Sequence, residues 1–309
     1  MTSTTTTTPA VGTATPKTMR KNAGGRGEGN PAKAGWASKG TLILICFLWI
    51  VPTFGLFITS FRPLDQANNS GWWEIFSHPS YIKDFSFSNY TTAITQANLG
   101  EAFINSMAIA LPATFIPLLV AAFAAYAFTF MEFPGRDWLF LLIVGLLVVP
   151  NYVAFVPVLR IYSNLHISGF AGVWLAHIGF GMSLAIYILR NYMATLPKTV
   201  IESAKIDGAS HFQTFFRLIL PMSVPALASF AIFQFLWVWN DLLVALVFIG
   251  PGPNAPLTVA VKNNLLGQAG AGWNLVTAGG FFSMIVPIIV FLSLQRFFVR
   301  GLTAGAVKG

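Results

Sequence analysis

The segment whose residue types and spacing are best suited to contact another molecule is charged and lies between long apolar runs. It reads ESAKIDGASHFQTFFRLILP, from Glu202 to Pro221. Gly208 fits the position just past a helix end, where a positive φ costs little. Ser210 and Gln213 have the spacing of a capping box that begins a second helix, and Pro221 marks where this helix gives way to the next apolar run. The spacing predicts a short helical hairpin that contacts another molecule in water.

Residue patterns for bond-making chemistry are absent from the sequence. It contains neither the GxxxxGK[ST] phosphate loop nor an HExxH helix, so ATP hydrolysis by that route and a zinc-protease site are excluded. The single cysteine, Cys46, is far in sequence from each histidine, and the histidines are scattered: His78, His166, His177 and His211. We therefore expect no catalytic residue, no metal site and no cofactor in this chain, and we do not expect an enzyme.

The composition is that of a membrane protein. Only 9% of the 309 residues are charged, and the mean hydropathy is +0.68. About 20 apolar residues cross a bilayer as a helix, and a further apolar run is broken by the Gly and Pro residues at 250–253. The prediction is an all-α integral membrane protein with six spans, over residues 41–60, 104–128, 138–158, 170–189, 224–249 and 276–295.

The distribution of positive charge predicts the orientation of these spans. Most of the 18 Lys and Arg residues fall on the side that holds both ends of the chain, which places both termini in the cytoplasm. The basic residues are dispersed, so nucleic-acid binding is not expected. The predicted parts are a disordered Thr-, Gly- and Pro-rich cytoplasmic tail, the cytoplasmic loop between spans four and five, two external loops and a cytoplasmic C-terminal tail: residues 1–38, 190–221, 61–103, 250–275 and 296–309.

The hairpin segment resembles the signature of the inner-membrane permease subunits of ATP-binding-cassette importers. That signature reads E-A-A, three residues, G, then nine residues to I-x-L-P. Here Glu202-Ser203-Ala204, Gly208 and Leu218 to Pro221 hold those places. Ser203 replaces an alanine and Leu218 replaces the isoleucine, both small changes on a helix face.

Other segments are similar to the MalG-type permease subunit of carbohydrate importers, and the resemblance covers about residues 40–309. The C-terminal run QRFFVRGLTAGAVKG carries it, together with the Trp72-Trp73 pair. The resemblance is also carried by the FSNY run at Phe87–Tyr90, the Phe103–Ser106 segment and Trp239-Asn240-Asp241.

The resemblance implies a permease for a sugar or oligosaccharide in a bacterial or archaeal cell membrane. The implied partners are a second, non-identical permease, two ATPase subunits that hold ATP and Mg, and an external solute-binding protein. The hairpin would be a coupling helix in a groove of an ATPase, and the C-terminal tail would reach toward the ATPases. The implied coupling residues are Glu202, Ser203, Ala204, Asp207, Gly208, Phe212, Phe215, Phe216, Leu218 and Pro221. The aromatic residues among them have an alternative role, which is packing against the chain's own helix ends.

The fifth span contains polar residues that could lie near a translocation path. Sugars are held by aromatic faces and by side chains that bond hydroxyl groups, and the span offers Gln234, Trp239, Asn240 and Asp241. Asp241 is the acid clearly placed within a span, where a charge is expensive and faces a cavity or a partner. A structural anchor that fixes the span by hydrogen bonds is the favoured alternative for Asp241.

Three alternatives remain for the cargo and for the role of the protein. The same class of permease could import a glycerol phosphodiester or a polyol. A secondary transporter working alone is disfavoured by the lack of a visible inverted repeat. A membrane scaffold without transport activity is the third alternative.

Overall fold

A computed structural model describes residues 35–266 and 272–304. Every regular element in this part of the chain is helical, which confirms the predicted all-helical class for these residues. Most of the predicted N-terminal tail and the last residues of the predicted C-terminal tail lie outside the described residues.

The longer helices are α1 (Trp36–Thr59), α5 (Leu99–Phe130), α6 (Arg136–Leu146), α7 (Asn151–Asn164), α8 (Gly169–Met193), α12 (Val224–Trp239) and α15 (Trp273–Ala304). The shorter ones are α2 (Leu64–Asn69), α3 (Glu74–Ser77), η1 (Pro79–Asp84), α4 (Ser88–Thr95), α9 (Lys198–Ile206), α10 (His211–Thr214), η2 (Phe215–Ile219), α11 (Leu220–Met222), α13 (Leu243–Phe248), α14 (Leu257–Ala260) and η3 (Val261–Leu266). Of the η elements, η1 is a 3₁₀ helix, whereas η2 and η3 are π-helical.

Between four and six membrane spans fit the described residues. The helices α1, α5, α8 and α15 are each long and apolar enough to cross a bilayer. Two bent pairs also qualify if each counts as one span: α6 with α7, bent by 103°, and His211–Met222 with α12, bent by 72°. The helix α15 continues past the predicted span end at residue 295 and ends at Ala304.

Two predicted spans are not continuous helices, and this corrects the sequence-based boundaries. The expected span 138–158 breaks after α6, because Pro150 disfavours helical geometry at the residue before it and stands at the cap of α7. The expected span 224–249 breaks at Asn240 and Asp241, where α12 ends and the short helix α13 follows.

The chain divides into two units, residues 1–50 and 51–309, and the boundary falls within α1. In the first unit the structure describes the beginning of α1, whose apolar side chains are exposed. All elements from α2 onward belong to the second unit.

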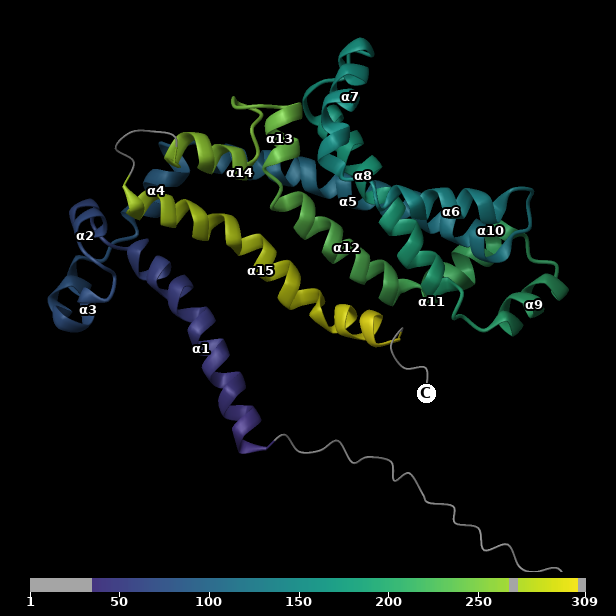
Figure 1. Cartoon of the computed structure of the whole chain (residues 1–309), viewed down its shortest axis with the longest axis horizontal. Coiled ribbons are helices and arrows are strands. Elements are labelled where there is room, and N and C mark those ends of the chain that lie inside the picture. Colours follow the sequence, from purple (N-terminus) through teal and green to yellow (C-terminus); the bar gives the residue numbers. More distant parts are fainter. Residues whose placement is uncertain (1–34, 267–271, 305–309) are drawn as a thin grey trace, which may run out of the picture. The chain divides into compact units, whose positions relative to one another are not determined.

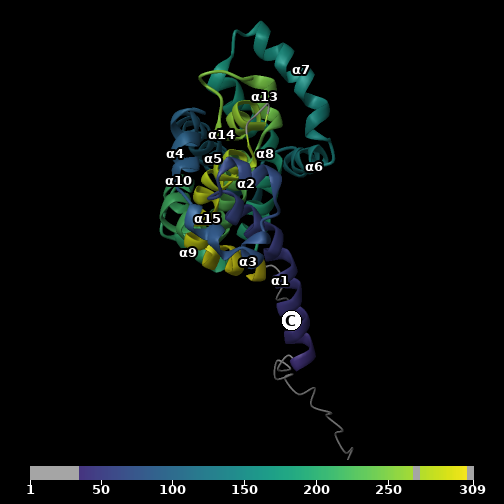
Figure 2. The ribbon, with the colours of Figure 1, turned by 90° about the vertical axis from the view of Figure 1, so that its left-hand side faces the viewer.

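The second unit is built around the packing of α5 against α8, with α12 in contact with α5, α8 and α15. Figure 1 shows α15 running alongside α12, and Figure 2 shows α15 below α5 and α8 in the view turned by 90°. Ala121, Ala122 and Ala125 on α5 are buried in one apolar cluster with Ala185 and Leu189 on α8. Small residues allow the two backbones to approach closely, which is the usual basis of helix association in membranes.

A buried glutamine joins these three helices. Gln234 on α12 donates from Nε2 to the carbonyl of Ala113 on α5 at 3.2 Å and to that of His177 on α8 at 3.5 Å. Gly181 on α8 leaves the space for it, because a Cβ there would lie 2.7 Å from Gln234 Oε1. The hydrogen bonds of Nε2 satisfy this donor in an apolar interior, so Gln234 fixes the position of α12.

Substituting Gly181→Ala is expected to destabilise the protein by about 1–3 kcal/mol, because the new methyl group displaces the Gln234 amide from its partners. Gly179→Ala is the matched control, since a Cβ at Gly179 meets open space. Alanine in a helix stabilises by about 0.5–1 kcal/mol relative to glycine, so Gly179→Ala should keep or raise the Tm. Thermal unfolding in detergent measures both, and equal Tm values for the two variants would contradict the role given to Gln234.

Candidate functional site

The hairpin between α9 and α10 turns at Gly208. Its φ is +76°, and no atom lies within 4 Å of the position that a Cβ would occupy. The amide of Ala209 donates to the carbonyl of Ala204 at 2.9 Å, and the amide of Gly208 donates to that of Lys205 at 3.1 Å. These two bonds form a Schellman motif, which ends α9 and satisfies the carbonyl groups of Ala204 and Lys205.

The second helix of the hairpin begins with the capping box predicted from the sequence. The amide of Gln213 donates to Ser210 Oγ at 3.3 Å, and the amide of Ser210 donates to Gln213 Oε1 at 2.9 Å. Tyr126 on α5 forms a hydrogen bond with His211 Nδ1 at 3.0 Å. The hairpin is therefore closed at its turn and tied to a membrane-spanning helix.

The aromatic residues of the hairpin have different environments. Phe215 is 1% exposed and stacks on Phe123 of α5, with ring centres 4.5 Å apart. Phe212 is 67% exposed, and its ring lies 4.5 Å from that of Phe216. Phe215 thus packs against the chain's own helix, whereas Phe212 presents an apolar ring to the surroundings.

The other predicted coupling residues fall into the same two environments. Ala204 is buried and Leu218 is half-buried, so both pack within the chain. The remaining predicted positions are exposed: Glu202, Ser203, Asp207, Gly208, Phe216 and Pro221.

Ile206 is an exposed apolar residue that the sequence analysis did not single out. It is 85% exposed, beside the turn at Gly208. The helical period could have identified Ile206 as exposed, because Ile201 and Ala204 form the buried face of α9. A residue two positions beyond Ala204 is rotated by about 200° from it and points away from that face.

The connection from the hairpin to α12 is irregular. Five residues from Phe215 form the π-helical element η2, and the chain bends by 72° at Ser223. Pro221 was expected to mark the end of this helix, but the helix continues to Met222. Proline and π turns are the usual causes of such bends, because both interrupt the regular hydrogen-bond ladder.

Asp241 serves as a hydrogen-bonding anchor at the far end of α12. Its Oδ2 accepts a hydrogen bond from the amide of Ala245 at 3.1 Å, near the start of α13. Its backbone carbonyl accepts from Thr258 Oγ1 at 2.6 Å, and His177 Nε2 lies 3.8 Å from Oδ2. These contacts connect α8, the turn after α12, α13 and α14.

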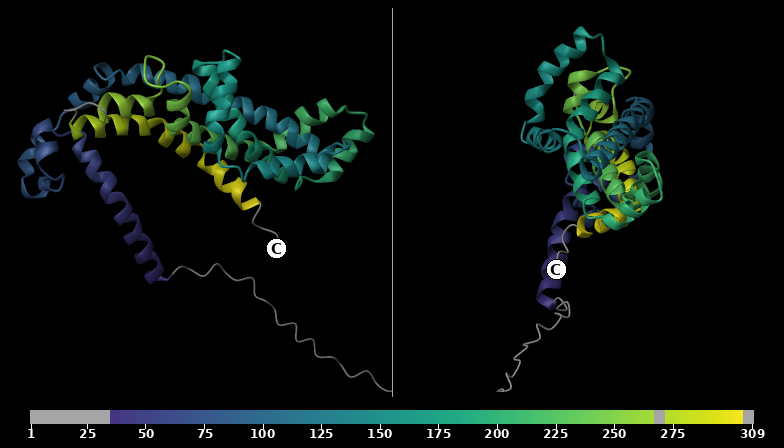
Figure 3. Two further views of the ribbon diagram at one scale, coloured as in Figure 1. Left: turned by 45° about the horizontal axis from the view of Figure 1, so that its top comes forward. Right: turned by 90° about the vertical axis from the view of Figure 1, so that its right-hand side faces the viewer.

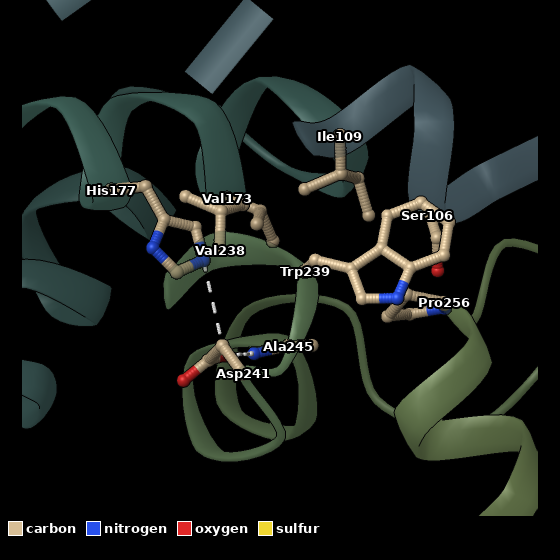
Figure 4. A pocket seen from close by; sticks show the side chains of 9 residues that line it. All are labelled: Ser106, Ile109, Val173, His177, Val238, Trp239, Asp241, Ala245 and Pro256. Carbon is tan, nitrogen blue, oxygen red and sulfur yellow. Dashed lines mark hydrogen bonds and ion pairs between the residues drawn. The ribbon is translucent and has the colours of Figure 1, made fainter. Parts of the chain in front are cut away.

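The four predicted path residues do not form one site. Gln234 is buried among α5, α8 and α12, and the Trp239 indole donates to the carbonyl of Ser283 on α15 at 3.0 Å. Asn240 is exposed and donates from Nδ2 to the carbonyl of Leu236 at 2.8 Å. Trp239 and Asp241 do meet, together with His177, around one small cavity (Figure 4).

This cavity is too small for a sugar. Its volume is about 10 Å³, near the minimum for a single water molecule. Pockets that enclose small organic ligands measure about 300–1,000 Å³. Within the described residues no group of three or more His, Cys, Asp or Glu side chains is placed to hold a metal ion.

The long apolar helices define a polytopic membrane protein, with an exposed hairpin between two of its spans. The chain belongs to the family of binding-protein-dependent transport system inner membrane components, whose family model matches residues 117–304. The match includes the hairpin and α12, and it confirms the resemblance found in the sequence.

Similar proteins with known names come from several bacteria. An osmoprotective compounds uptake permease protein of Synechocystis sp. is 54% identical, over 86% of this chain and 90% of that protein. An alpha-glucoside transport system permease protein of Rhizobium meliloti is 38% identical, over 89% of this chain and 97% of that protein. A chain in the crystal structure of a bacterial alginate ABC transporter, in complex with an alginate pentasaccharide-bound periplasmic protein, has the same fold. Its TM-score is 0.60 at 14% identity, over 85% of this chain and 94% of that chain.

Substituting Asp241→Ala is expected to destabilise the protein by about 1 kcal/mol, the usual effect of removing a side chain that caps a helix. Asp241→Asn keeps an oxygen acceptor for the amide of Ala245, so its Tm should stay close to that of the unmodified protein. Thermal unfolding in detergent separates the two variants. A Tm for Asp241→Asn as low as that for Asp241→Ala would show that the negative charge near His177 matters more than the cap.

Proposed function

We propose that this chain is a permease subunit of an ATP-driven importer that moves a sugar or oligosaccharide across a bacterial or archaeal cell membrane. The observation that carries the proposal is the family match over residues 117–304, which includes the docking hairpin. Relatives named for alpha-glucosides and for arabinooligosaccharides support a carbohydrate as the solute.

The proposed arrangement has six spans, with each bent helix pair counted as one. Both termini and the hairpin lie in the cytoplasm, in agreement with the distribution of Lys and Arg along the sequence. A second, non-identical permease lies beside this chain, two ATPase subunits bind beneath them, and an external binding protein delivers the solute. ATP and Mg bind to the ATPases, and this chain hydrolyses nothing.

The hairpin is proposed as the element through which energy enters. A coupling element must be stiff, so that closure of the ATPases moves the spans as bodies. The Schellman motif, the capping box and the bond between Tyr126 and His211 supply that stiffness. Ile206 and Phe212 supply exposed apolar contacts for a groove on the ATPase.

The solute path is proposed to lie at a face that this chain shares with the second permease. The cavity beside Asp241 holds about one water molecule, so it does not enclose a sugar. Asn240, exposed where α12 ends, remains available to such a shared path. Gln234, Trp239 and Asp241 act in this proposal by holding α12 in place.

A second candidate cargo is an osmoprotective solute. The relative that is 54% identical is named for the uptake of osmoprotective compounds. A polyol and a glycerol phosphodiester, both considered from the sequence, are further candidate cargoes. Thermal-shift measurements on the solute-binding protein with a panel of oligosaccharides, polyols and glycerol phosphodiesters separate these cargoes.

Uptake by the complete complex in proteoliposomes tests the proposal as a whole. Accumulation of labelled solute should require ATP on the side of the ATPases and the solute-binding protein on the other side. Transport by this chain alone without ATP would instead establish a secondary transporter. Failure of the chain to associate with any ATPase would favour a scaffold.

Substituting Gly208→Asn is expected to weaken assembly with the ATPases by about tenfold or more, equivalent to at least about 1.4 kcal/mol. Asparagine tolerates a positive φ, and the open space at Gly208 accepts its side chain, so the chain itself should fold normally. Gly135→Asn is the matched control, because Gly135 has a φ of +78° and equally open surroundings between α5 and α6. Full uptake and normal ATPase coupling in Gly208→Asn would count against docking at the hairpin.

Truncating the exposed and buried phenylalanines should separate docking from folding. Phe212→Ala is expected to keep the Tm and to weaken ATPase binding about 10- to 30-fold, since removing an aromatic anchor costs about 1.4–2 kcal/mol. Phe215→Ala should lower stability by about 3–5 kcal/mol, because it leaves a cavity beside Phe123. Thermal unfolding and co-purification with the ATPases measure the two effects. Unchanged ATPase binding by Phe212→Ala would remove this residue from the docking surface.

A further inference from the structure

An aromatic cluster is attached to the last two turns of α1. Trp72 packs on Gly55, where a Cβ would overlap the indole ring, and Phe54 meets the same indole edge-on with ring centres 6.0 Å apart. Trp73 and Phe76 lie 6.1 Å and 6.2 Å from the Trp72 ring. Trp72 therefore connects the short helix α3 directly to the end of a membrane-spanning helix.

A second group of rings is attached one turn further along α1. Phe57 meets Phe61 edge-on at 5.0 Å, and Phe61 contacts Phe87 at 5.2 Å. Phe57 also contacts Phe281 on α15, with ring centres 5.4 Å apart. Both groups thus surround the end of α1, and we call their exposed members, Trp73, Phe76 and Phe87, the aromatic collar.

The side chains of the collar are large and apolar, and most of their surface is exposed. Trp73 is 61% exposed, Phe76 70% and Phe87 72%. These are large apolar side chains, and each has one side held against a neighbouring ring. Such a surface rarely faces water in the native assembly.

Hydrogen bonds keep the collar at a fixed level. Arg62, directly after α1, is buried and donates to the carbonyl and to the hydroxyl of Ser70. Asn89 donates from Nδ2 to the carbonyls of Ser60 and Arg62, at 2.9 Å each, and Asn274 on α15 donates to Asn89 Oδ1 at 2.8 Å. The segment that carries the rings is thereby joined to the ends of both α1 and α15. Figure 3 shows α2 and the short helix after it beside the ends of these two helices.

The depth of the collar follows from helix geometry. Phe54 and Phe57 lie five and two residues before the last residue of α1, Thr59. At a rise of 1.5 Å per residue, they lie about 7.5 Å and about 3 Å below the helix end. Rings that contact them therefore lie close to the end of an apolar span. Trp and other aromatic residues favour the level where hydrocarbon meets headgroups.

We infer that the aromatic collar is a membrane-interface anchor, whose partner is the headgroup and upper acyl region of the lipid bilayer. The surface that continues from it supports lipid as the occupant, since Phe54, Leu56 and Phe57 are exposed on the last turns of an apolar span. Arg62, which hydrogen-bonds within this segment, is buried and faces inward. The anchor fixes the height of α1 and of the segment after it, whatever solute the protein carries.

Fluorescence quenching in liposomes tests this inference with the full chain and the subunits that co-purify with it. Cys46 is the single cysteine, so Cys46→Ser provides a background for Phe76→Cys labelled with a small fluorophore. Asn254→Cys, in the exposed loop after α13, is the control site. Phe87→Cys is an independent second site, and the Tm of each variant verifies folding.

Lipids with a nitroxide on the headgroup should quench the label at residue 76 at least about twofold more than lipids with the nitroxide deep in the acyl chain. Aqueous iodide should quench the label at residue 254 strongly and the label at residue 76 weakly. Quenching at residues 76 and 87 by iodide as strong as at residue 254 would overturn the inference. Quenching there by neither lipid nor iodide would also overturn it, because it would place a protein surface over the collar.

Discussion

The close approach of α5, α8 and α12 is the constraint on which the second unit depends. The membrane interior offers no water to a stray polar group, so helices there associate through shape and a few satisfied hydrogen bonds. Gly181 creates the space and Gln234 fills it, with its amide bonded to one carbonyl on α5 and another on α8. This contact fixes α12, and both interrupted ends of α12 take their positions from it.

The two ends of α12 are interrupted in different ways. Toward the hairpin, the π turns and Pro221 bend the chain at Ser223. At the other end, Asp241 accepts the amide of Ala245 and receives a hydrogen bond from Thr258 at its carbonyl. The single helix α12 thus connects the hairpin to a polar corner that contains Asp241.

Sequence analysis predicted the features that depend on neighbouring residues. The caps around Gly208 and Ser210 follow from local backbone chemistry, and the apolar runs follow from composition. Hydropathy averaged over a span could not reveal the breaks before Pro150 and after Trp239, because apolar runs lie on both sides of each break. Phe212 and Phe215 are chemically identical, and only the presence of Phe123 on a distant helix makes one of them core.

The small volume of the cavity beside Asp241 has a consequence for how such proteins diverge. The packing beside Asp241 leaves room for about one water molecule, so this corner of the structure offers no volume that a solute could fill. Proteins named for osmoprotective compounds, for alpha-glucosides and for alginate all resemble this chain, at 54%, 38% and 14% identity. These names differ although the fold is shared, so the fold alone does not specify the solute.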